Sequence, residues 1–359
     1  MHQRHTCFVN SMRSFGGAEV WMLRAALGLQ KRGQAVSIVA QPDSDLLPRA
    51  QELGLEATPI PIRCDTAPWT IARLTRYFRQ NRVEALFCNL TKDLKAAGVA
   101  GRLAGIGKIL ASRESDFPLK DKLYYRWYFN KIASGVVVNS LATRRTVLAS
   151  VPWLDPERIH LLYKGVDLKR FQPRSSPLKV PTVGFVGQLI ERKGLPEIMV
   201  AWQLLEAKTW PIPPRLQLAG EGPLRNRLEK WRRSLQYPER VEIRGFVADI
   251  ADFYANTTVL VLPSRAEGFG LAAAEASACS LPVIAGRASS LPEIVRDNET
   301  GILVPPRDAT ALAAAIHKLL VTPELGKRMG QRGRRLMEEH FDHERTLDQL
   351  QELLAGRPL

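Results

Sequence analysis

Short, wholly apolar runs recur along the chain, and each is followed by a longer segment with helical periodicity. Ala85–Cys88 and Val259–Leu262 are examples of such runs, and Leu195–Glu206 is an example of the longer segments. A strand that is apolar at every position is buried on both faces, as in a parallel sheet covered by helices. The alternation therefore predicts α/β architecture with doubly wound parallel sheets.

The apolar runs fall into two groups, separated by a segment rich in Pro and Ser. The chain has 359 residues, more than a single core usually serves, so we expect two domains. The expected parts are an N-terminal domain at 1–170, a linker at 171–181, a C-terminal domain at 182–340, and a C-terminal helix at 341–359 that could pack back on the N-terminal domain.

The positive charge of the chain is concentrated in its first half. Of the net charge of +15, residues 1–170 carry +12, from 26 Lys and Arg against 14 Asp and Glu. Such a surplus suits nucleic acid, an anionic membrane surface or an anionic substrate.

Several classes of protein and site are disfavoured by what the sequence lacks. No apolar stretch is long enough to span a bilayer, and the first residues do not read as a secretory signal, so we expect a cytoplasmic protein. The His residues do not pair at metal-ligand spacing, and the sequence has no GxSxG or HExxH motif. The four cysteines are far apart and read as small buried residues: Cys7, Cys64, Cys88 and Cys279.

One candidate site follows the strand Val259–Leu262, where the sequence PSRAEGFGLAAAE opens a helix. Ligands of open α/β sheets bind at the carboxyl ends of strands, and a helix start presents N–H groups that suit a diphosphate. Glu267 lies on the loop, and Glu275 lies about 7 Å into the helix, where carboxylates can accept hydrogen bonds from hydroxyls. An acidic helix cap followed by a surface Glu gives the same pattern, so spacing alone leaves both interpretations open.

Three other strand ends carry loops of interest. Arg192 and Lys193 could neutralise a leaving diphosphate, although a solvated basic turn is the simpler interpretation of that segment alone. Gly220–Pro223 forms a turn that allows close backbone approach. Gly16 and Gly17 open the first helix, but the segment is neither a dinucleotide-binding fingerprint nor a Walker A loop.

Taken together and in this order, these runs resemble the retaining glycosyltransferases of GT-B fold, the glycosyl transferases group 1 (family 4). The resemblance spans essentially the whole chain and is strongest from Thr182 to Pro306. It implies two Rossmann-like domains that face a central cleft, with a nucleotide sugar bound by the C-terminal one. The matching segments are Gly16–Glu19, Gly187–Leu189 with Lys193–Gly194, Gly220–Pro223, Gly245–Val247, Glu267 with Glu275, Leu281–Ala285 and Pro292–Pro306.

The resemblance also implies roles for single residues. Glu267 would contact the donor sugar, Lys193 with Arg192 would stabilise the departing diphosphate, and Glu275 would hold the ribose. Members of the family normally retain anomeric configuration and use no metal, so we expect neither metal nor cofactor. The other implied donor-site residues are Gly16 and Gly17 against the diphosphate, Gly222 and Val247 in the segments that would hold the base, and Gly268, Phe269, Gly270 and Leu271 around sugar and phosphate.

The sequence departs from the family pattern at three places. Gln188 stands where a first phosphate-binding cation is common, and Ser280 stands where the helix usually ends in Gly. A non-Gly residue with positive φ at that helix end would cost about 1 kcal/mol. Where many members have a His after an N-terminal strand, this chain offers Arg113, Glu114 and Asp116 as candidate acceptor-side residues, and no general base is assigned.

The acceptor is expected on the N-terminal half. Residues Leu119–Lys131 interleave cations with aromatic side chains, which suits an anionic membrane surface, and an amphipathic core helix explains the aromatics equally well. Arg73, Arg76 and Arg79 add a basic face at helical spacing.

The sequence thus predicts a retaining, metal-independent hexosyltransferase that uses a nucleotide-diphosphate sugar, with UDP slightly favoured. The expected acceptor is a glycan or lipid-linked molecule of bacterial lipopolysaccharide or surface-polysaccharide synthesis, reached on the inner face of the membrane. One alternative is a GT-B nucleotide-sugar epimerase. Another is a basic protein that binds nucleic acid or membrane without catalysis, although no nucleic-acid reader motif is found.

Overall fold

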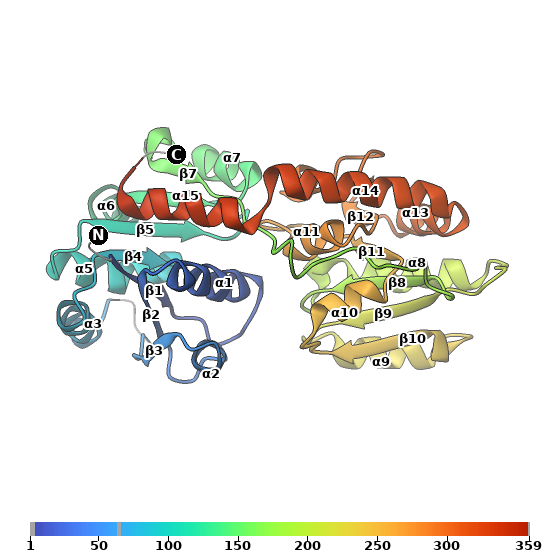
Figure 1. Cartoon of the computed structure of the whole chain (residues 1–359), viewed down its shortest axis with the longest axis horizontal. Helices are drawn as coiled ribbons and strands as arrows, with labels where there is room; N and C mark the ends of the chain where they lie inside the picture. Colours follow the sequence, from blue (N-terminus) through green and yellow to red (C-terminus); the bar gives the residue numbers. More distant parts are fainter. Residues whose placement is uncertain (1–3, 63–65, 358–359) are drawn as a thin grey trace. The chain divides into compact units, whose positions relative to one another are not determined.

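The computed structural model describes residues 4–62 and 66–357, which form two compact units (Figure 1). The first unit runs to Lys164 and includes the chain from Glu344 onward, and the second unit runs from Gly165 to His343. The segment expected as a linker, 171–181, belongs to the second unit.

The first unit is built on a seven-stranded parallel sheet in the order β3-β2-β1-β4-β5-β6-β7. The helix α3 packs against α5, and α1 contacts the last helix, α15, so that helices flank the sheet. The strands are β1 (His5–Asn10), β2 (Ala35–Ala40), β3 (Glu56–Pro59), β4 (Ala85–Cys88), β5 (Lys108–Arg113), β6 (Gly135–Val138) and β7 (Ile159–Leu161). The helices are α1 (Gly17–Lys31), α2 (Leu46–Glu52), α3 (Pro68–Gln80), α4 (Thr91–Asp93), η1 (Leu94–Gly98), α5 (Val99–Leu103), α6 (Leu123–Trp127), η2 (Tyr128–Ile132), α7 (Leu141–Ser150), η3 (Pro156–Arg158) and α15 (His343–Ala355).

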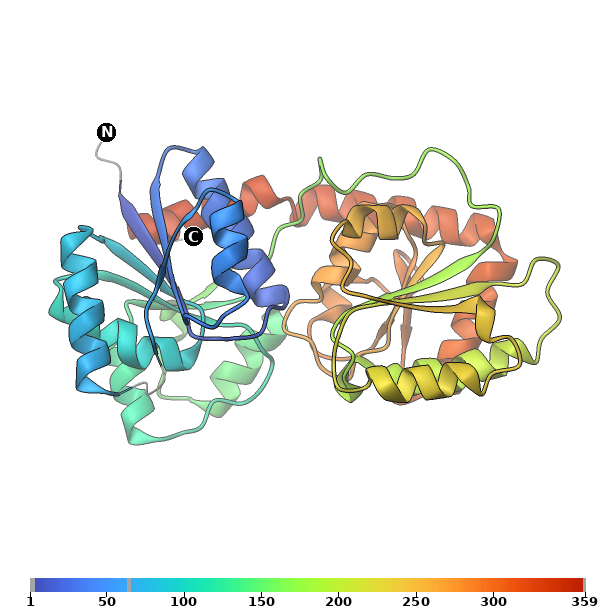
Figure 2. The same ribbon diagram turned by 90° about the horizontal axis from the view of Figure 1, so that it is seen from below.

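The second unit has a six-stranded parallel sheet in the order β10-β9-β8-β11-β12-β13. The helix α8 packs against α13 and α11 packs against α14, and Figure 2 shows helices on both sides of the sheet. The strands are β8 (Thr182–Val186), β9 (Arg215–Ala219), β10 (Val241–Gly245), β11 (Val259–Leu262), β12 (Val283–Gly286) and β13 (Gly301–Val304). The helices are η4 (Glu191–Lys193), α8 (Leu195–Glu206), α9 (Arg225–Arg233), η5 (Pro238–Arg240), α10 (Ile250–Ala255), α11 (Leu271–Ala278), α12 (Leu291–Ile294), α13 (Ala309–Val321) and α14 (Pro323–His340).

The apolar strands explain why the sheets lie at the centre of each unit. Every residue of β4, β6, β11 and β12 is buried, as a strand covered by helices on both faces requires. In both sheets the strand order reverses next to the first strand, at β1/β4 and at β8/β11, where ligands of doubly wound sheets bind. The doubly wound α/β prediction is therefore confirmed for both units.

Three cysteines, Cys7, Cys88 and Cys279, are free and buried, and Cys64 lies outside the described residues. Burial raises the pKa of the Cys7 and Cys279 thiols to about 12, which keeps them protonated at neutral pH.

No helix among the described residues is long and apolar enough to cross a membrane.

Candidate functional site

In the second unit, Glu267 and Lys193 come together from two loops that follow the neighbouring strands β8 and β11. The Lys193 Nζ lies 2.6 Å from Glu267 Oε1, and the hydroxyl of Ser264 donates to the same oxygen at 2.8 Å. Both charged side chains are largely buried, with exposed fractions of 16% and 7%. A carboxylate and an ammonium group are thus held in fixed positions at the carboxyl end of the sheet.

Backbone contacts between these two loops explain why the pair forms. Gly194 has φ of +79°, and a Cβ there would lie 2.3 Å from the carbonyl oxygen of Pro263. The N–H of Arg265 donates to the carbonyl of Arg192 at 2.8 Å, and the Arg192 guanidinium donates to the carbonyl of Ala266. Glycine at position 194 therefore permits the close approach that brings Lys193 to Glu267.

The loop after Glu267 leads into α11. Gly270 caps this helix with φ of +95°, a left-handed conformation that glycine adopts without steric cost. Ser290 donates its hydroxyl to the carbonyl of Glu267 at 3.2 Å, and the buried ring of Phe269 packs against Phe341 with centroids 5.8 Å apart. The segment Gly268–Leu271 is thereby held with the N-terminal turn of α11 beside Glu267.

Glu275 lies on α11 and is only 5% exposed. Its Oε2 accepts a hydrogen bond of 3.0 Å from the hydroxyl of Tyr254, a residue of α10 that was not predicted. The sequence offered no signal for this contact, because Tyr254 lies in a different helix and in an ordinary apolar pattern. Glu275 is therefore an oriented carboxylate in the interior next to the candidate site.

The turns that follow β8, β9 and β10 are hydrogen-bonded to one another. The N–H of Gly220 donates to Gly245 at 2.7 Å, and the N–H of Leu189 donates to Glu221 at 2.9 Å. Gly220 has φ of +141°, and a Cβ there would lie 1.8 Å from the carbonyl oxygen of Gly187. The glycines of these turns are thus needed for the packing of the turns themselves.

Other predicted residues of this region lie around those turns. Gly222 belongs to the hydrogen-bonded turn, Val247 is half-buried, and Gln188 is exposed. Phe246, beside Val247, is 57% exposed.

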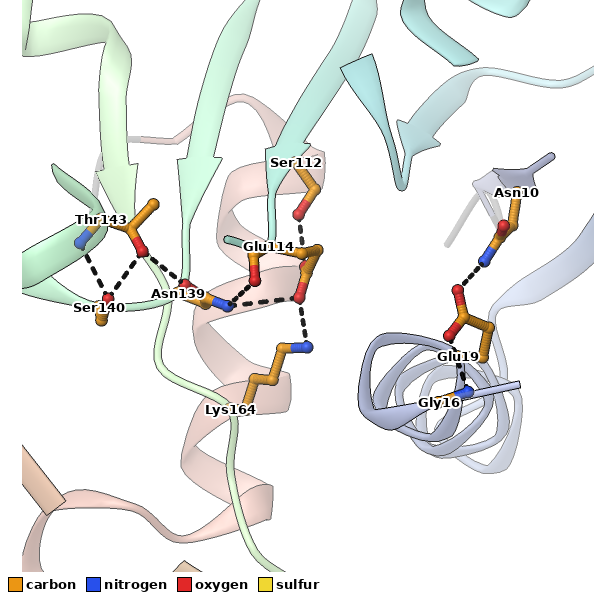
Figure 3. A network of polar contacts seen from close by, with 9 residues as sticks. All are labelled: Asn10, Gly16, Glu19, Ser112, Glu114, Asn139, Ser140, Thr143 and Lys164. Atoms are coloured by element: carbon orange, nitrogen blue, oxygen red, sulfur yellow. Dashed lines mark hydrogen bonds and ion pairs between the residues drawn. The ribbon is translucent and has the colours of Figure 1, made fainter. Parts of the chain in front are cut away.

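In the first unit, the loop after β1 is fixed by the buried Glu19 of α1 (Figure 3). Its Oε1 accepts from Asn10 Nδ2 at 2.9 Å, and its Oε2 accepts from the N–H of Gly16 at 3.0 Å. Gly16 therefore uses its N–H within the protein, whereas a Cβ built on Gly17 would meet no atom within 4 Å. Gly17 is the open position of this loop.

The three candidate acceptor-side residues lie at the end of β5 and in the loop that follows it, and each interacts with different groups. Figure 3 shows Glu114 surrounded by Ser112, Asn139 and Lys164. Ser112 Oγ donates to Glu114 at 2.6 Å, Asn139 Nδ2 donates at 3.4 Å, and the buried Lys164 forms an ion pair with it. These partners come from the ends of β5, β6 and β7, so the strand order assembles them.

Arg113 and Asp116 are held separately from Glu114. The Arg113 guanidinium donates to the carbonyl of Phe117 at 2.7 Å and to the hydroxyl of Thr91 at 3.3 Å. Asp116 accepts a hydrogen bond from the hydroxyl of Thr146. Lys164 was not predicted as a site residue, because it lies three residues beyond the end of β7.

A buried carboxyl group, Asp93, joins the ends of β1 and β4. It accepts hydrogen bonds from the N–H and hydroxyl of Ser11 and from the N–H of Leu90 at 3.0 Å. Burial raises the pKa of Asp93 to about 7, against these hydrogen bonds and the charge of Lys92. No group of three or more His, Cys, Asp or Glu side chains suited to a metal occurs in the part of the chain that the structure describes.

The apolar and aromatic side chains of the segment Leu119–Lys131 differ in their exposure to solvent. Phe129 is fully buried in the core of the first unit, whereas Leu123, Tyr124 and Trp127 are 81%, 44% and 48% exposed. The core interpretation therefore holds for Phe129, and α6 presents an apolar and aromatic surface.

Comparison with known proteins identifies the family. Residues 167–336 match the model for Glycosyl transferases group 1, and residues 15–170 match the model for Glycosyltransferase Family 4. The chain belongs to the group 1 glycosyltransferases. This confirms the resemblance seen in the sequence, and it establishes a glycosyltransferase that uses a nucleotide sugar.

Relatives of this glycosyltransferase act on diverse acceptors. It is 28% identical over 316 residues, 81% of each chain, to a GDP-mannose-dependent alpha-(1-6)-phosphatidylinositol monomannoside mannosyltransferase of Mycolicibacterium smegmatis. It is 32% identical over 200 residues to a D-inositol 3-phosphate glycosyltransferase of Thermobifida fusca, covering 50% of this chain and 45% of the relative.

Solved structures agree on the fold of this glycosyltransferase. The crystal structure of Anabaena Alr3699/HepE in complex with UDP-glucose superposes with a TM-score of 0.83 at 19% identity, over 98% of this chain and 99% of that one. This likeness, with the two parallel-sheet units, confirms the GT-B fold.

Proposed function

We propose that this glycosyltransferase moves a hexose-type sugar from a nucleotide-diphosphate sugar to a glycan or lipid-linked acceptor, with retention of anomeric configuration and without a metal. The observation that carries the proposal is the buried pair of Lys193 and Glu267 beside the start of α11. A fixed ammonium group and helix N–H groups can stabilise the charge that develops on a leaving diphosphate, which is the electrostatic work a metal does elsewhere.

In this proposal the two members of the pair have different tasks. Lys193, assisted by Arg192, faces the departing diphosphate, and Glu267 accepts hydrogen bonds from the hydroxyls of the donor sugar. Their ion pair at 2.6 Å holds both side chains in place before the donor binds, so little reorganisation is needed.

The remaining contacts to the nucleotide sugar come from loops at the carboxyl ends of the strands and from α11. Glu275, oriented by Tyr254, holds the ribose, and the backbone of Gly268–Leu271 holds sugar and phosphate. The turns at Gly222 and Val247 border the base.

UDP is the nucleotide we favour slightly, because the HepE structure contains UDP-glucose. The M. smegmatis relative is GDP-mannose-dependent, so a panel of UDP-, GDP- and ADP-sugars in a thermal-shift assay chooses among the bases. Bound nucleotide raises stability with its occupancy, by about 2.7 kcal/mol at one hundred times Kd.

The decisive variant is Glu267→Gln, which removes the charge and keeps the shape. We expect sugar transfer to fall by about 10²-fold or more, as losses of electrostatic stabilisation typically do. Glu239→Gln, which changes an exposed carboxylate of the same unit, is the matched control and should transfer at the rate of the unchanged enzyme. Unchanged transfer by Glu267→Gln would remove the role given to this residue.

Transfer that persists in EDTA supports the metal-independent mechanism, and loss of transfer that a divalent cation restores contradicts it.

We further propose that the enzyme works at the anionic inner surface of the cytoplasmic membrane, in lipopolysaccharide or surface-polysaccharide synthesis. Exposed Leu123, Tyr124 and Trp127 on α6, with the exposed Arg73 and Arg76 of α3, support a peripheral contact. The enzyme should pellet with anionic vesicles at low salt and not with neutral ones, and failure to bind either kind rejects this site of action.

A further inference from the structure

The guanidinium of Arg113 is half-buried at the end of β5 and contacts neutral groups. Two of its nitrogens donate to the carbonyl of Phe117 and the hydroxyl of Thr91, and its Nε is buried without a hydrogen-bond partner among the described residues. Both of the hydrogen-bond partners of its guanidinium are uncharged. Arg113 therefore keeps a positive charge and a donor that the protein itself does not use.

This arrangement is costly for the folded protein. Removal from water lowers the pKa of Arg113, which means that its charged form is destabilised where it lies. The adjacent Glu114, by contrast, has its charge compensated by Lys164. A charge that is largely removed from water without a counter-ion is destabilised, and an anionic ligand would supply that counter-ion.

Besides the accepting carbonyl of Phe117, the surroundings of Arg113 include a group that can donate hydrogen bonds and a second cation. Thr91 accepts its hydrogen bond from Arg113, so the hydroxyl proton of Thr91 remains able to donate. Tyr125 lies close enough to interact electrostatically with both Arg113 and Lys95, and Lys95 Nζ lies 5.7 Å from the Tyr125 ring. A guanidinium, an ammonium group and the hydroxyl of Thr91 are donors that suit a phosphate.

We propose that Arg113 binds a phosphate group carried by the acceptor, assisted by Thr91 and Lys95. The inference rests on the proposed function, because that function places the acceptor on the first unit. The phosphate could belong to a soluble sugar phosphate or to a lipid headgroup. The exposed side chains of Phe117 and Leu123, 52% and 81% exposed on the segment that follows β5, offer an apolar surface to lipid.

The test uses the full-length enzyme and reads the site directly by nuclear magnetic resonance. Inorganic phosphate is titrated while the Arg113 Nε–Hε signal and the backbone N–H signals of Thr91 and Phe117 are followed. We expect saturable shifts at all three positions in the unchanged enzyme. At the two backbone signals, Arg113→Lys should bind about tenfold more weakly, since it keeps the charge but loses the two-pronged donor geometry, and Arg113→Met should show no saturation.

Two controls establish that the shifts report a phosphate bound at Arg113. Arg145→Met removes an exposed arginine from the same unit and should leave the shifts unchanged, which excludes a general effect of charge. Glu267→Gln should also leave them unchanged while it lowers transfer by about 10²-fold or more, so the failure of either proposal is seen independently of the other. Absence of saturable shifts, or equal shifts in Arg113→Met, overturns the phosphate site.

A second titration distinguishes the sources of phosphate. Dihexanoyl phosphatidic acid, which is soluble as a monomer, is compared with glucose 6-phosphate at the same signals. Tighter binding of the lipid, with additional shifts at Leu123, assigns a lipid-borne phosphate, and tighter binding of the sugar phosphate assigns a soluble one.

Discussion

The buried carboxyl group of Asp93 makes the free energy of unfolding depend on pH. In the unfolded chain its carboxyl group loses its proton near 3.8, whereas the folded protein keeps the proton until about pH 7. Between these values the folded state binds more protons than the unfolded state, so the free energy of unfolding falls as pH rises. The stabilisation is fully present below pH 3.8 and is lost as pH passes 7, and it amounts to on the order of 4 kcal/mol.

We therefore expect Asp93→Asn to remove this pH dependence. Denaturant unfolding should show that the free energy of unfolding of the unchanged enzyme falls from pH 4 to pH 7. In the variant this fall should be smaller by a few kcal/mol. The variant loses one hydrogen-bond acceptor, so its stability at pH 4 should be the lower of the two. An identical pH profile for both proteins would mean that Asp93 is ionised in the folded state.

Ser280 follows the end of α11 with φ of +55°. The N–H of Leu281 donates to Ala276 and the N–H of Ser280 donates to Ser277, both at 3.0 Å, which is the hydrogen-bonding pattern of a helix that ends in a left-handed residue. Strain at this position was predicted from the sequence, because the helix lacks the glycine that such an end favours.

Ser280→Gly should raise the free energy of unfolding by about 1 kcal/mol, since glycine avoids the steric cost of positive φ. Ser234→Gly is the matched control, because Ser234 caps α9 with φ of −90° and gains nothing from glycine. Chemical denaturation of the two variants checks the contrast, and a loss of stability in Ser280→Gly contradicts it.

At the scale of elements, α15 is attached to α1 by close packing and by charge. A Cβ on Gly28 would lie 2.4 Å from Leu347 Cδ1, and Arg32 pairs with Glu344 and Asp348 at 2.6 and 2.8 Å. Glycine at position 28 therefore sets the distance between the two helices.

Gly28→Val should destabilise the enzyme by about 1–3 kcal/mol, as overpacking of a core does. Leu347→Ala in the same chain should recover part of that loss, because it removes the atoms that the new side chain meets. A double-mutant cycle measured by thermal unfolding tests the coupling, and strictly additive effects would show that the two positions do not share this contact.

Element positions were predictable wherever hydrophobicity alone decides them. The strands β4 and β11 and the helix α8 have the predicted bounds, since each is set by an uninterrupted apolar or helical pattern. The strand β3, Glu56–Pro59, was not predicted because it lies at the sheet edge and its residues are partly exposed and polar. The C-terminal helix expected at 341–359 is α15, His343–Ala355, which Phe341 and Asp342 separate from α14.

Residues of the candidate site were predictable only where a local pattern carries them. Glu267 and Lys193 lie in loops that directly follow strands, and the family resemblance singled them out. The partners Tyr254, Asn139 and Lys164 were not found, because each meets its carboxylate through the order of strands or the packing of helices rather than through spacing along the chain.

At the scale of the whole molecule, the two units should respond differently to nucleotide. UDP should slow hydrogen exchange mainly in residues 182–306, where the proposed donor loops lie, and much less in the first unit. Mass spectrometry of exchanged peptides measures this directly. Equal protection throughout both units, or protection confined to the first, would contradict the assignment of the donor to the second unit.

The attachment of α15 also constrains how the protein is made. When residues 1–164 have been synthesised, the chain contains every strand of the first sheet, but the helix α15, which places Leu347 against α1, follows only after the whole second unit. During that interval the nascent first unit lacks the apolar side chains of Leu350 and Leu353, which are fully buried in the finished protein. Its surface over α1 then stays open to water and to chaperones, and the first unit is completed only after the second unit has been synthesised.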